Sequence, residues 1–288
     1  MSEPKAAVAE SRLTESQGLL GDGRDASVRY DMWEGLRIAR RECGDGAITL
    51  ILIHGWACDS STWMPLLRRL PPQTVTAIAP DLPGFGSSSW RAPWTFETCS
   101  GVIVDIVRQV PRDRPVVLCG HSMGGAVALL AAARLSTSRP ANHVILEAYA
   151  PLPPFRGPRV ERIRQLKAEG TGGTWFADVV RSWYVSGISP PDLQAAVGVG
   201  RAVASEVLIE SQEEVLRGLG PEVVRAADER ALWIFGAKDT NRDLARVRAA
   251  AAARRATLRV IPGCGHMPHY EFPGAVASII ADRCEALT

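Results

Sequence analysis

The chain has 288 residues, within the range of one large α/β domain, and 46% of them are hydrophobic, so a sizeable core can be buried and global disorder is excluded. Its 33 basic and 31 acidic residues leave a net charge of +2, which argues against nucleic acid or an anionic membrane as the main partner. No apolar run approaches the roughly 20 residues that a membrane-spanning helix requires.

The first residues are rich in Glu, Ser, Ala and Gly and predict a disordered leader over residues 1–27. This stretch has no apolar segment typical of a secretion signal, so we expect a cytoplasmic protein. The cysteines are scattered without C-x-x-C pairs, so we expect reduced thiols, and neither a metal nor an organic cofactor. The six are Cys43, Cys58, Cys99, Cys119, Cys264 and Cys284.

Residues 28–33 and 36–41 predict a hairpin that turns near Glu34-Gly35. Short apolar runs rich in β-branched residues follow, which is typical of parallel strands covered on both faces. These strands are predicted at 48–54, 75–80, 116–120 and 143–148. Helices are predicted between and after them at 62–70, 96–110 and 125–134. The alternation predicts an α/β fold with a mostly parallel, doubly wound sheet.

The strand–helix rhythm breaks at a proline-rich stretch after residue 150 and returns at residue 231. Residues 152–226 contain helical stretches and no convincing strand, and they are predicted to form an inserted helical lid. The core is predicted over 28–151 and 227–288. Its last elements are predicted as strands at 231–236 and 257–261 and helices at 242–253 and 273–286.

Aromatic residues of the predicted lid favour an apolar acyl pocket, although a helical insertion also needs aromatic residues for its own interior. The candidate pocket residues are Trp175, Phe176, Trp183 and Tyr184.

Ser122 is the candidate nucleophile. It lies in the run Gly120-His121-Ser122-Met123-Gly124, between a predicted strand and an Ala-rich predicted helix. A serine on such a turn exposes its hydroxyl above the sheet, and the flanking glycines let strand and helix approach closely. G-x-S-x-G alone is a weak motif, and the alternative is a glycine-rich turn that only packs a helix on a strand. The strand–turn–helix context favours the nucleophile.

His266 is the candidate base, because the base of such a serine is expected on a loop that follows the last strand. Of the five histidines only His266 and His269 lie there, and His266 directly follows the glycine turn at the end of the predicted strand 257–261. His269 is the alternative.

Asp239 is the candidate acid that orients the imidazole, because it ends an apolar strand and gives the chain order Ser122, Asp239, His266. Two other carboxylates compete for this position. Glu147 ends the neighbouring predicted strand, and Asp243 begins the next predicted helix as a cap.

Two backbone N–H groups are needed to hold the negative oxygen of a tetrahedral intermediate. Met123, directly after the nucleophile, is the first candidate. Trp56, in the loop after the strand 48–54, is the second; the alternative for its side chain is a plain core aromatic.

Taken together in this order, several segments resemble the α/β-hydrolase superfamily over about residues 28–287. They are His54-Gly55-Trp56, Asp81-Leu82-Pro83-Gly84-Phe85-Gly86-Ser87, the run around Ser122, Gly236-Ala237-Lys238-Asp239, and Gly265-His266 followed by Glu271. The resemblance implies the α/β-hydrolase fold. It implies structural rather than catalytic roles for Asp81 and His54.

Within that superfamily, the His54-Gly55-Trp56 loop with Trp63 resembles the carboxylesterases that demethylate pimeloyl-carrier-protein methyl ester. In those enzymes, arginines of a four-helix lid bind the carrier's phosphate. The predicted lid begins with basic residues that suit an acidic carrier or form a solvated helix face. They are Arg156, Arg159, Arg162, Arg164 and Lys167. His121 departs from that subgroup, which tends to have Trp there.

These residues predict a serine hydrolase that cleaves a carboxylic ester, or a related acyl bond, of a small and largely apolar substrate through an acyl-enzyme. Two alternatives of other classes stay open: a lyase or cyclase that uses His266 as a base, and a ligand receptor with the same fold. The expected partner is a small ester or acyl substrate, free or bound to a carrier protein. The chain is expected to be a monomer or a homodimer.

Overall fold

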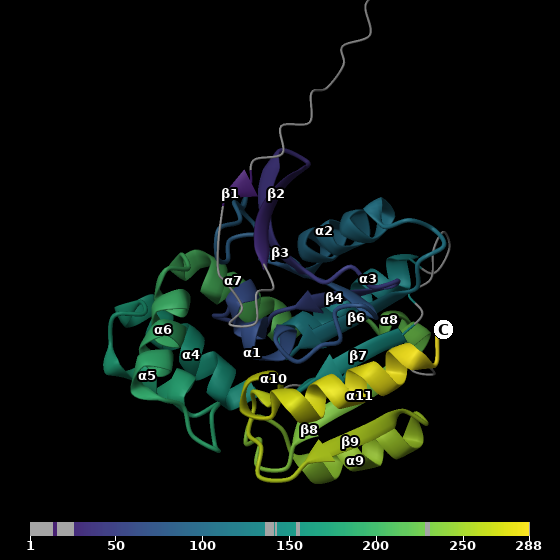
Figure 1. Ribbon diagram of the computed structural model, residues 1–288. Helices are drawn as coiled ribbons and strands as arrows, with labels where there is room; N and C mark the ends of the chain where they lie inside the picture. The colour runs from purple at the N-terminus through teal and green to yellow at the C-terminus, as the bar shows by residue number, and fades with distance from the viewer. Residues whose placement is uncertain are drawn as a thin grey trace, which may run out of the picture.

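The computed structural model describes residues 14–15, 26–135, 141, 143–153, 156–227 and 231–287. Within them, one sheet has the strand order β1-β2-β3-β5-β4-β6-β7-β8-β9 (Figure 1). The strands are β1 (Thr14–Glu15), β2 (Ser27–Trp33), β3 (Leu36–Cys43), β4 (Ile48–Ile53), β5 (Val75–Pro80), β6 (Val116–His121), β7 (His143–Glu147), β8 (Ala231–Gly236) and β9 (Thr257–Ile261). Neighbours from β5 to β9 run parallel, and β1, β2 and β3 are joined to them by antiparallel pairings. The predicted mostly parallel sheet is confirmed.

The parallel strands form where the sequence is apolar and β-branched. Every residue of β4, β6 and β8 is buried, because helices cover both faces of the sheet. The bounds of β5, β8 and β9 are those predicted, and those of β4, β6 and β7 differ by one residue at the carboxyl end.

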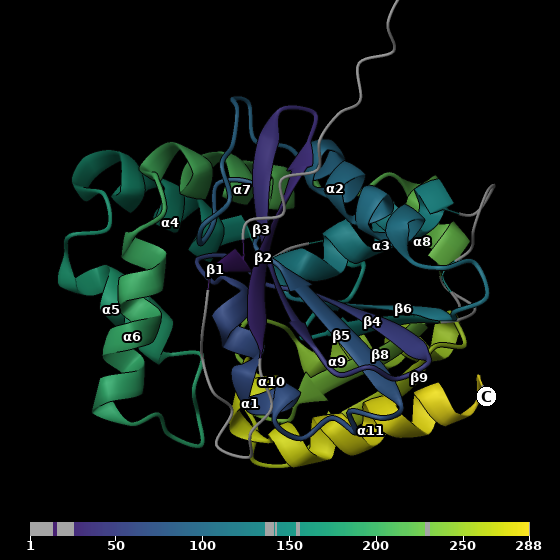
Figure 2. The ribbon, with the colours of Figure 1, turned by 45° about the horizontal axis from the view of Figure 1, so that its top comes forward.

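Successive side chains of a strand point to opposite faces, and this alternation divides the core into two clusters. From β4, Leu50 and Leu52 pack with the helices α1 (Met64–Leu67) and α11 (Pro273–Glu285). Ile51 and Ile53 pack on the other face with α2 (Phe96–Gln109), α3 (Met123–Leu135) and α9 (Leu244–Ala253). Figures 1 and 2 show α2 and α3 across the sheet from α11.

Two predicted helices are shorter than expected by two or more residues. The helix predicted at 62–70 is a 3-10 turn, η1 (Ser60–Trp63), followed by the single turn α1, and Pro71 and Pro72 follow it. A residue before proline is pushed out of the helical region, which limits this helix. The helix predicted from residue 242 begins at Leu244, because the carboxylate of Asp243 accepts the N–H of Ala245 at 2.9 Å and caps the helix.

Between β7 and β8 the described residues form helices and no strand. We call residues 156–227 the helical segment. Its helices are α4 (Arg156–Glu169), α5 (Thr174–Arg181), α6 (Pro190–Arg201), α7 (Ser205–Arg217) and α8 (Pro221–Ala227). In both views α4 to α7 gather on one side of the sheet, whereas α8 packs against α3 (Figures 1 and 2).

Most of the predicted leader, residues 1–27, lies outside the described residues. Within it, Thr14–Glu15 forms β1 and pairs antiparallel with β2. Among the residues that the structure describes, no helix combines the length and the apolar character needed to cross a bilayer.

Candidate active site

Ser122 occupies the turn from β6 into α3. Its φ of 50° lies in the left-handed region, which residues other than glycine adopt rarely. The turn is held by two backbone hydrogen bonds: the N–H of Ser122 donates to the carbonyl of Glu147 at 2.8 Å, and the N–H of Gly125 donates to the carbonyl of Ser122 at 2.9 Å. A Cβ at Gly120 would overlap the carbonyl of Gly124, so the close approach of strand and helix depends on glycine there. The turn therefore presents the Ser122 side chain at the carboxyl end of β6.

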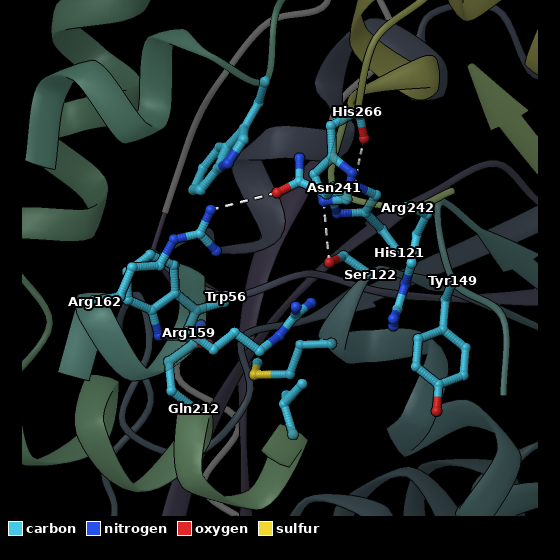
Figure 3. A pocket seen from close by; sticks show the side chains of 13 residues that line it. Trp56, His121, Ser122, Tyr149, Arg159, Arg162, Gln212, Asn241, Arg242 and His266 are labelled. Carbon is cyan, nitrogen blue, oxygen red and sulfur yellow. Dashed lines mark hydrogen bonds between the residues drawn. The ribbon is translucent and has the colours of Figure 1, made fainter. Parts of the chain in front are cut away.

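His266 lies on the loop between β9 and α10 (Pro268–Glu271), with its ring beside Ser122 (Figure 3). Its Nε2 is 3.1 Å from Oγ of Ser122, and its Nδ1 is 2.8 Å from Oδ2 of Asp239. The backbone N–H of His266 donates to the carbonyl of Trp183 at 2.9 Å, which ties this loop to the helical segment. The structure thus places all three predicted residues in one row of hydrogen bonds.

Asp239 is buried on the loop after β8, and its second carboxylate oxygen, Oδ1, also accepts hydrogen bonds. Oδ1 accepts the backbone N–H of Asn241 at 2.9 Å and its side-chain N–H at 3.3 Å. Burial by itself raises the pKa of Asp239, but the charge of His266 and the hydrogen bonds from His266 and Asn241 outweigh it and hold the pKa below its usual value. Asp239 is therefore ionised at neutral pH, and it is oriented by the hydrogen bonds of its neighbours.

The alternative base and the alternative acid pair with each other beneath the site. Nδ1 of His269 is 2.9 Å from Oε1 of Glu147, and both side chains are fully buried. Nε2 of His269 is 3.1 Å from the hydroxyl of Thr62, so both ring nitrogens are occupied away from Ser122. The third candidate acid, Asp243, caps α9. Of the candidates, only His266 and Asp239 therefore lie in the row with Ser122.

Trp56 and Met123 line the same cavity as Ser122. Met123 is the first residue of α3, so its N–H has no carbonyl one turn earlier to bond. The backbone N–H of Trp56 donates to no acceptor in the described part of the chain. The indole N–H of Trp56 donates to the carbonyl of Leu208 in α7 at 3.0 Å, which fixes this loop against the helical segment. Both backbone donors are available beside Ser122.

The cavity at Ser122 is small and polar. Its volume is about 30 Å³, which is room for about one water molecule. Thirteen residues line it (Figure 3), and three of them are arginines. They are Trp56, His121, Ser122, Met123, Tyr149, Arg159, Arg162, Trp183, Gln212, Val215, Asn241, Arg242 and His266. This lining is more polar than the apolar pocket expected from the sequence.

Of the four aromatic residues predicted to line the pocket, the structure brings only Trp183 to this cavity. Phe176 is fully buried against Trp56, with 5.9 Å between the ring centres, and Trp175 packs edge-on against Phe176. Tyr184 lines a neighbouring cavity of about 260 Å³. The helical segment has to bury an apolar interior of its own, and this interior takes up Trp175 and Phe176.

The basic residues at the start of the helical segment divide between two faces of α4. Arg159 is buried and, with Arg162, lines the cavity at Ser122, whereas Arg164 and Lys167 are exposed and pair with glutamates. The interpretation as a solvated face fits the exposed residues Arg156, Arg164 and Lys167, and it does not fit Arg159 or Arg162. The spacing of three residues between Arg159 and Arg162 is the signal that both point the same way.

Further lining residues are absent from the sequence-based candidates, among them Tyr149, Gln212, Val215, Asn241 and Arg242. Asn241 and Arg242 follow Asp239 on the loop after β8, so their nearness in the chain is a usable signal. Gln212 lies on a mostly apolar face of α7, where the sequence pattern does not distinguish a core position from a cavity wall.

The six cysteines are buried thiols, in agreement with the prediction. Burial raises the pKa of Cys58 to about 12 and that of Cys284 to about 11, so both thiols are protonated at neutral pH. Within the described residues, no cluster of His, Cys, Asp and Glu is suited to hold a metal ion.

Comparison with known proteins places this geometry in a family. The sequence model described as the alpha/beta hydrolase family matches residues 50–279. The chain is 32% identical to the lipase LipV of Mycobacterium tuberculosis over 147 residues, which cover 46% of this chain and 53% of the lipase. It is 34% identical to a pimeloyl-[acyl-carrier protein] methyl ester esterase of Neisseria meningitidis over 95 residues, which cover 33% of this chain and 28% of the esterase. The matched part thus spans about half of the lipase and less of the esterase.

The fold is shared with solved hydrolases. The structure of a thermophilic esterase from Thermogutta terrifontis superposes with a TM-score of 0.75 at 21% sequence identity. The match covers 96% of this chain and 98% of the esterase, so the two chains share their fold.

Proposed function

The chain belongs to the alpha/beta hydrolase family, and from this premise we propose that it is a serine hydrolase that cleaves a carboxylic ester through an acyl-enzyme. One observation carries the proposal: Oγ of Ser122 lies 3.1 Å from Nε2 of His266, whose Nδ1 lies 2.8 Å from Asp239. A serine hydroxyl is a weak nucleophile at neutral pH and needs such a base. The partial matches to a lipase and a methyl ester esterase support the same reaction class.

In this proposal, Oγ of Ser122 attacks the ester carbonyl carbon while Nε2 of His266 takes the hydroxyl proton. The carbonyl π electrons move onto the oxygen, and the tetrahedral intermediate then expels the alcohol, which receives the proton from His266. Water attacks the acyl-enzyme by the same steps and releases the acid. Asp239 accepts the Nδ1–H of His266 throughout, which fixes the tautomer and stabilises the imidazolium.

The negative oxygen of the intermediate is assigned to the N–H groups of Trp56 and Met123. Both residues line the cavity at Ser122, and neither N–H is used within the fold by a described acceptor. Donors held in place before the reaction lose no energy to reorganisation when the charge develops.

The helical segment is proposed to act as a lid. The free volume of about 30 Å³ next to Ser122 is small, so we propose that the site widens when the substrate enters. The helical segment supplies Arg159, Arg162, Trp183, Gln212 and Val215 to the wall of the cavity, and its displacement would widen it.

The proposal is tested with Ser122→Ala and short p-nitrophenyl esters. We expect the variant to lose turnover and to keep its melting temperature, because the side chain removed has no packing role beyond the site. Ser182→Ala, which changes an exposed serine of the helical segment, is the matched control and should hydrolyse the esters as the unaltered protein does. A fluorophosphonate probe should label the unaltered protein and Ser182→Ala but not Ser122→Ala. Undiminished turnover by Ser122→Ala would refute the assignment.

A further inference from the structure

Three arginines from two separate elements converge on the cavity at Ser122. Arg159 and Arg162 extend from α4, and Arg242 extends from the loop after β8. Figure 3 shows the Arg159 side chain reaching towards Ser122 from the side away from His266. Arg159 and Arg242 are only 8% and 9% exposed. The cavity therefore concentrates positive charge next to the proposed nucleophile.

No carboxylate lines this cavity, and Asp239 behind it is the acidic group whose charge acts on Arg159 and Arg242. Arg162 donates to the side-chain oxygen of Asn241 at 3.3 Å and lies 5.8 Å from the ring centre of Trp56. Arg242 lies 5.9 Å from the ring centre of Tyr149. Within the described residues, neither Arg162 nor Arg242 forms an ion pair.

Three exposed arginines of the helical segment do form ion pairs. Arg164, Arg181 and Arg217 of the helical segment each pair with an acidic residue three positions away. These three exposed arginines thus pair with carboxylates, whereas Arg162 and Arg242, which line the cavity, do not within the described residues.

Burying like charges together is unfavourable unless something compensates them. Burial, and then the charges of Arg242 and Arg162, lowers the pKa of Arg159 to about 10, so this guanidinium is still charged at neutral pH. A bound anion compensates such a group well, because a guanidinium forms two parallel hydrogen bonds with a carboxylate or a phosphate.

We propose that the substrate itself carries an anionic group, a carboxylate or a phosphate, which Arg159, Arg162 and Arg242 bind beside Ser122. This inference rests on the proposed ester hydrolysis and names the class of ester. The anionic group belongs to the small molecule and not to the surface of a protein carrier, because Arg159 and Arg242 are buried.

The space next to the arginines is consistent with such a substrate. A second cavity of about 550 Å³ shares Tyr149, Val215 and Arg242 with the cavity at Ser122. Arg242 stands at the junction of the two. A group bound by Arg242 is thus next to the reacting serine and next to room for the remainder of the molecule.

The test compares two esters that differ only in charge: the p-nitrophenyl monoester of glutaric acid, and the same ester with the free carboxylate replaced by a carboxamide. We expect the unaltered protein to have the higher kcat/KM for the anionic ester. Arg242→Gln and Arg162→Gln should each lower that value by about 10- to 100-fold, as expected for the loss of a hydrogen bond between charged groups, and should lower the value for the neutral ester by a clearly smaller factor. Arg164→Gln, on the exposed face of α4, is the control and should retain the preference.

Competition identifies the anion. Glutarate and inorganic phosphate are added separately while the neutral ester is hydrolysed, and inhibition that weakens in Arg242→Gln supports the site. Inhibition by glutarate alone assigns a carboxylate, inhibition by phosphate alone assigns a phosphate, and inhibition by neither overturns the proposal. Melting temperatures establish that each variant is folded. If either Arg242→Gln or Arg162→Gln does not fold, the test uses the other variant.

Two results separate this inference from the proposed function. If Ser122→Ala is inactive but the two esters react equally well, the anionic site is wrong and the serine hydrolase stands. An equal loss on both esters in Arg242→Gln and Arg162→Gln also overturns the inference, because the arginines then act on the reaction itself or on the fold. If Ser122→Ala stays active, the proposed function fails first.

Discussion

Asp239 is linked to His266 directly and to Arg162 through a single neighbour, Asn241. Its Oδ2 faces His266, while its Oδ1 accepts both N–H groups that Asn241 offers. The amide oxygen of Asn241 in turn accepts Arg162 at 3.3 Å. Asn241 therefore contacts both the acid and an arginine of the cavity.

Asp239→Asn should lower kcat for p-nitrophenyl esters by about 10³- to 10⁴-fold, because an amide can donate to Nδ1 and favour the wrong tautomer of His266. Asp243→Asn is the matched control, four residues further along. It should leave kcat unchanged, since Asp243 caps α9, and asparagine caps a helix about as well. If Asp243→Asn lost kcat and Asp239→Asn did not, the acid would have been misassigned.

The pH dependence of stability follows from the lowered pKa of Asp239. The folded protein binds a proton on this group less readily than the unfolded chain, whose value is 3.8, so ionised Asp239 stabilises the fold. This stabilisation is complete above that value and is lost as the pH falls through the lower pKa of the folded state. Urea unfolding between pH 6 and pH 3 should show a smaller loss of unfolding free energy for Asp239→Asn than for the unaltered protein. If the unfolding free energy of both proteins fell equally between pH 6 and pH 3, the lowered pKa of Asp239 would be contradicted.

At the level of elements, a buried pair joins β7 to α10. Oε1 of Glu147 accepts both the backbone N–H and Nδ1 of His269, at 2.6 Å and 2.9 Å. The His269 ring lies 4.3 Å from that of Trp63 and 4.7 Å from that of His121. This buried cluster holds α10, the helix that begins two residues after His266.

Glu147→Gln should lower the unfolding free energy by about 1–3 kcal/mol, because the new amide N–H group is buried without an acceptor in place of a carboxylate oxygen. Chemical denaturation measures this change. The kcat of the folded variant should stay within about 10-fold of the unaltered value, well short of the loss expected at the catalytic acid. A loss as large as that of Asp239→Asn would make Glu147 the acid instead.

The elements differ in how far the sequence predicts them. The parallel strands β4 to β9 are predicted to within one residue because a covered parallel strand must be apolar throughout, and Ser122, Asp239 and His266 then follow from the carboxyl ends of β6, β8 and β9. The inward face of α4 is harder to predict, because it depends on where the helix docks. From the sequence alone, Arg159 cannot be distinguished from the other four basic residues at the start of the helical segment.

On the scale of the whole molecule, the helical segment is attached to the core at the start of α2. Glu210 of α7 accepts the backbone N–H of Trp94 at 2.7 Å, and Glu214 accepts that of Phe96 at 2.9 Å. The first N–H groups of a helix have no partner within it, and negative charge there is favourable. Glu214 thus accepts the first N–H of a core helix, and Glu210 holds the residue before the N-cap of that helix.

Glu214→Ala should lower the unfolding free energy by about 1–3 kcal/mol, since the buried N–H of Phe96 loses its acceptor. Hydrogen exchange at the first turn of α2 should become faster, and trypsin should cut the helical segment sooner. Glu213→Ala, the adjacent residue on the exposed side of α7, is the control and should change neither measurement. Unchanged exchange at Phe96 would show that the attachment lies elsewhere.

The burial of all six thiols has a practical consequence for studying the opening of the site. Maleimide dyes react with thiolates, and the native cysteines offer none to solvent at neutral pH, so they need not be replaced before labelling. A single cysteine introduced at Val160, which is 50% exposed on the outer side of α4, would take up the dye alone. Its fluorescence would then report the displacement of α4 during turnover, in a protein otherwise unaltered.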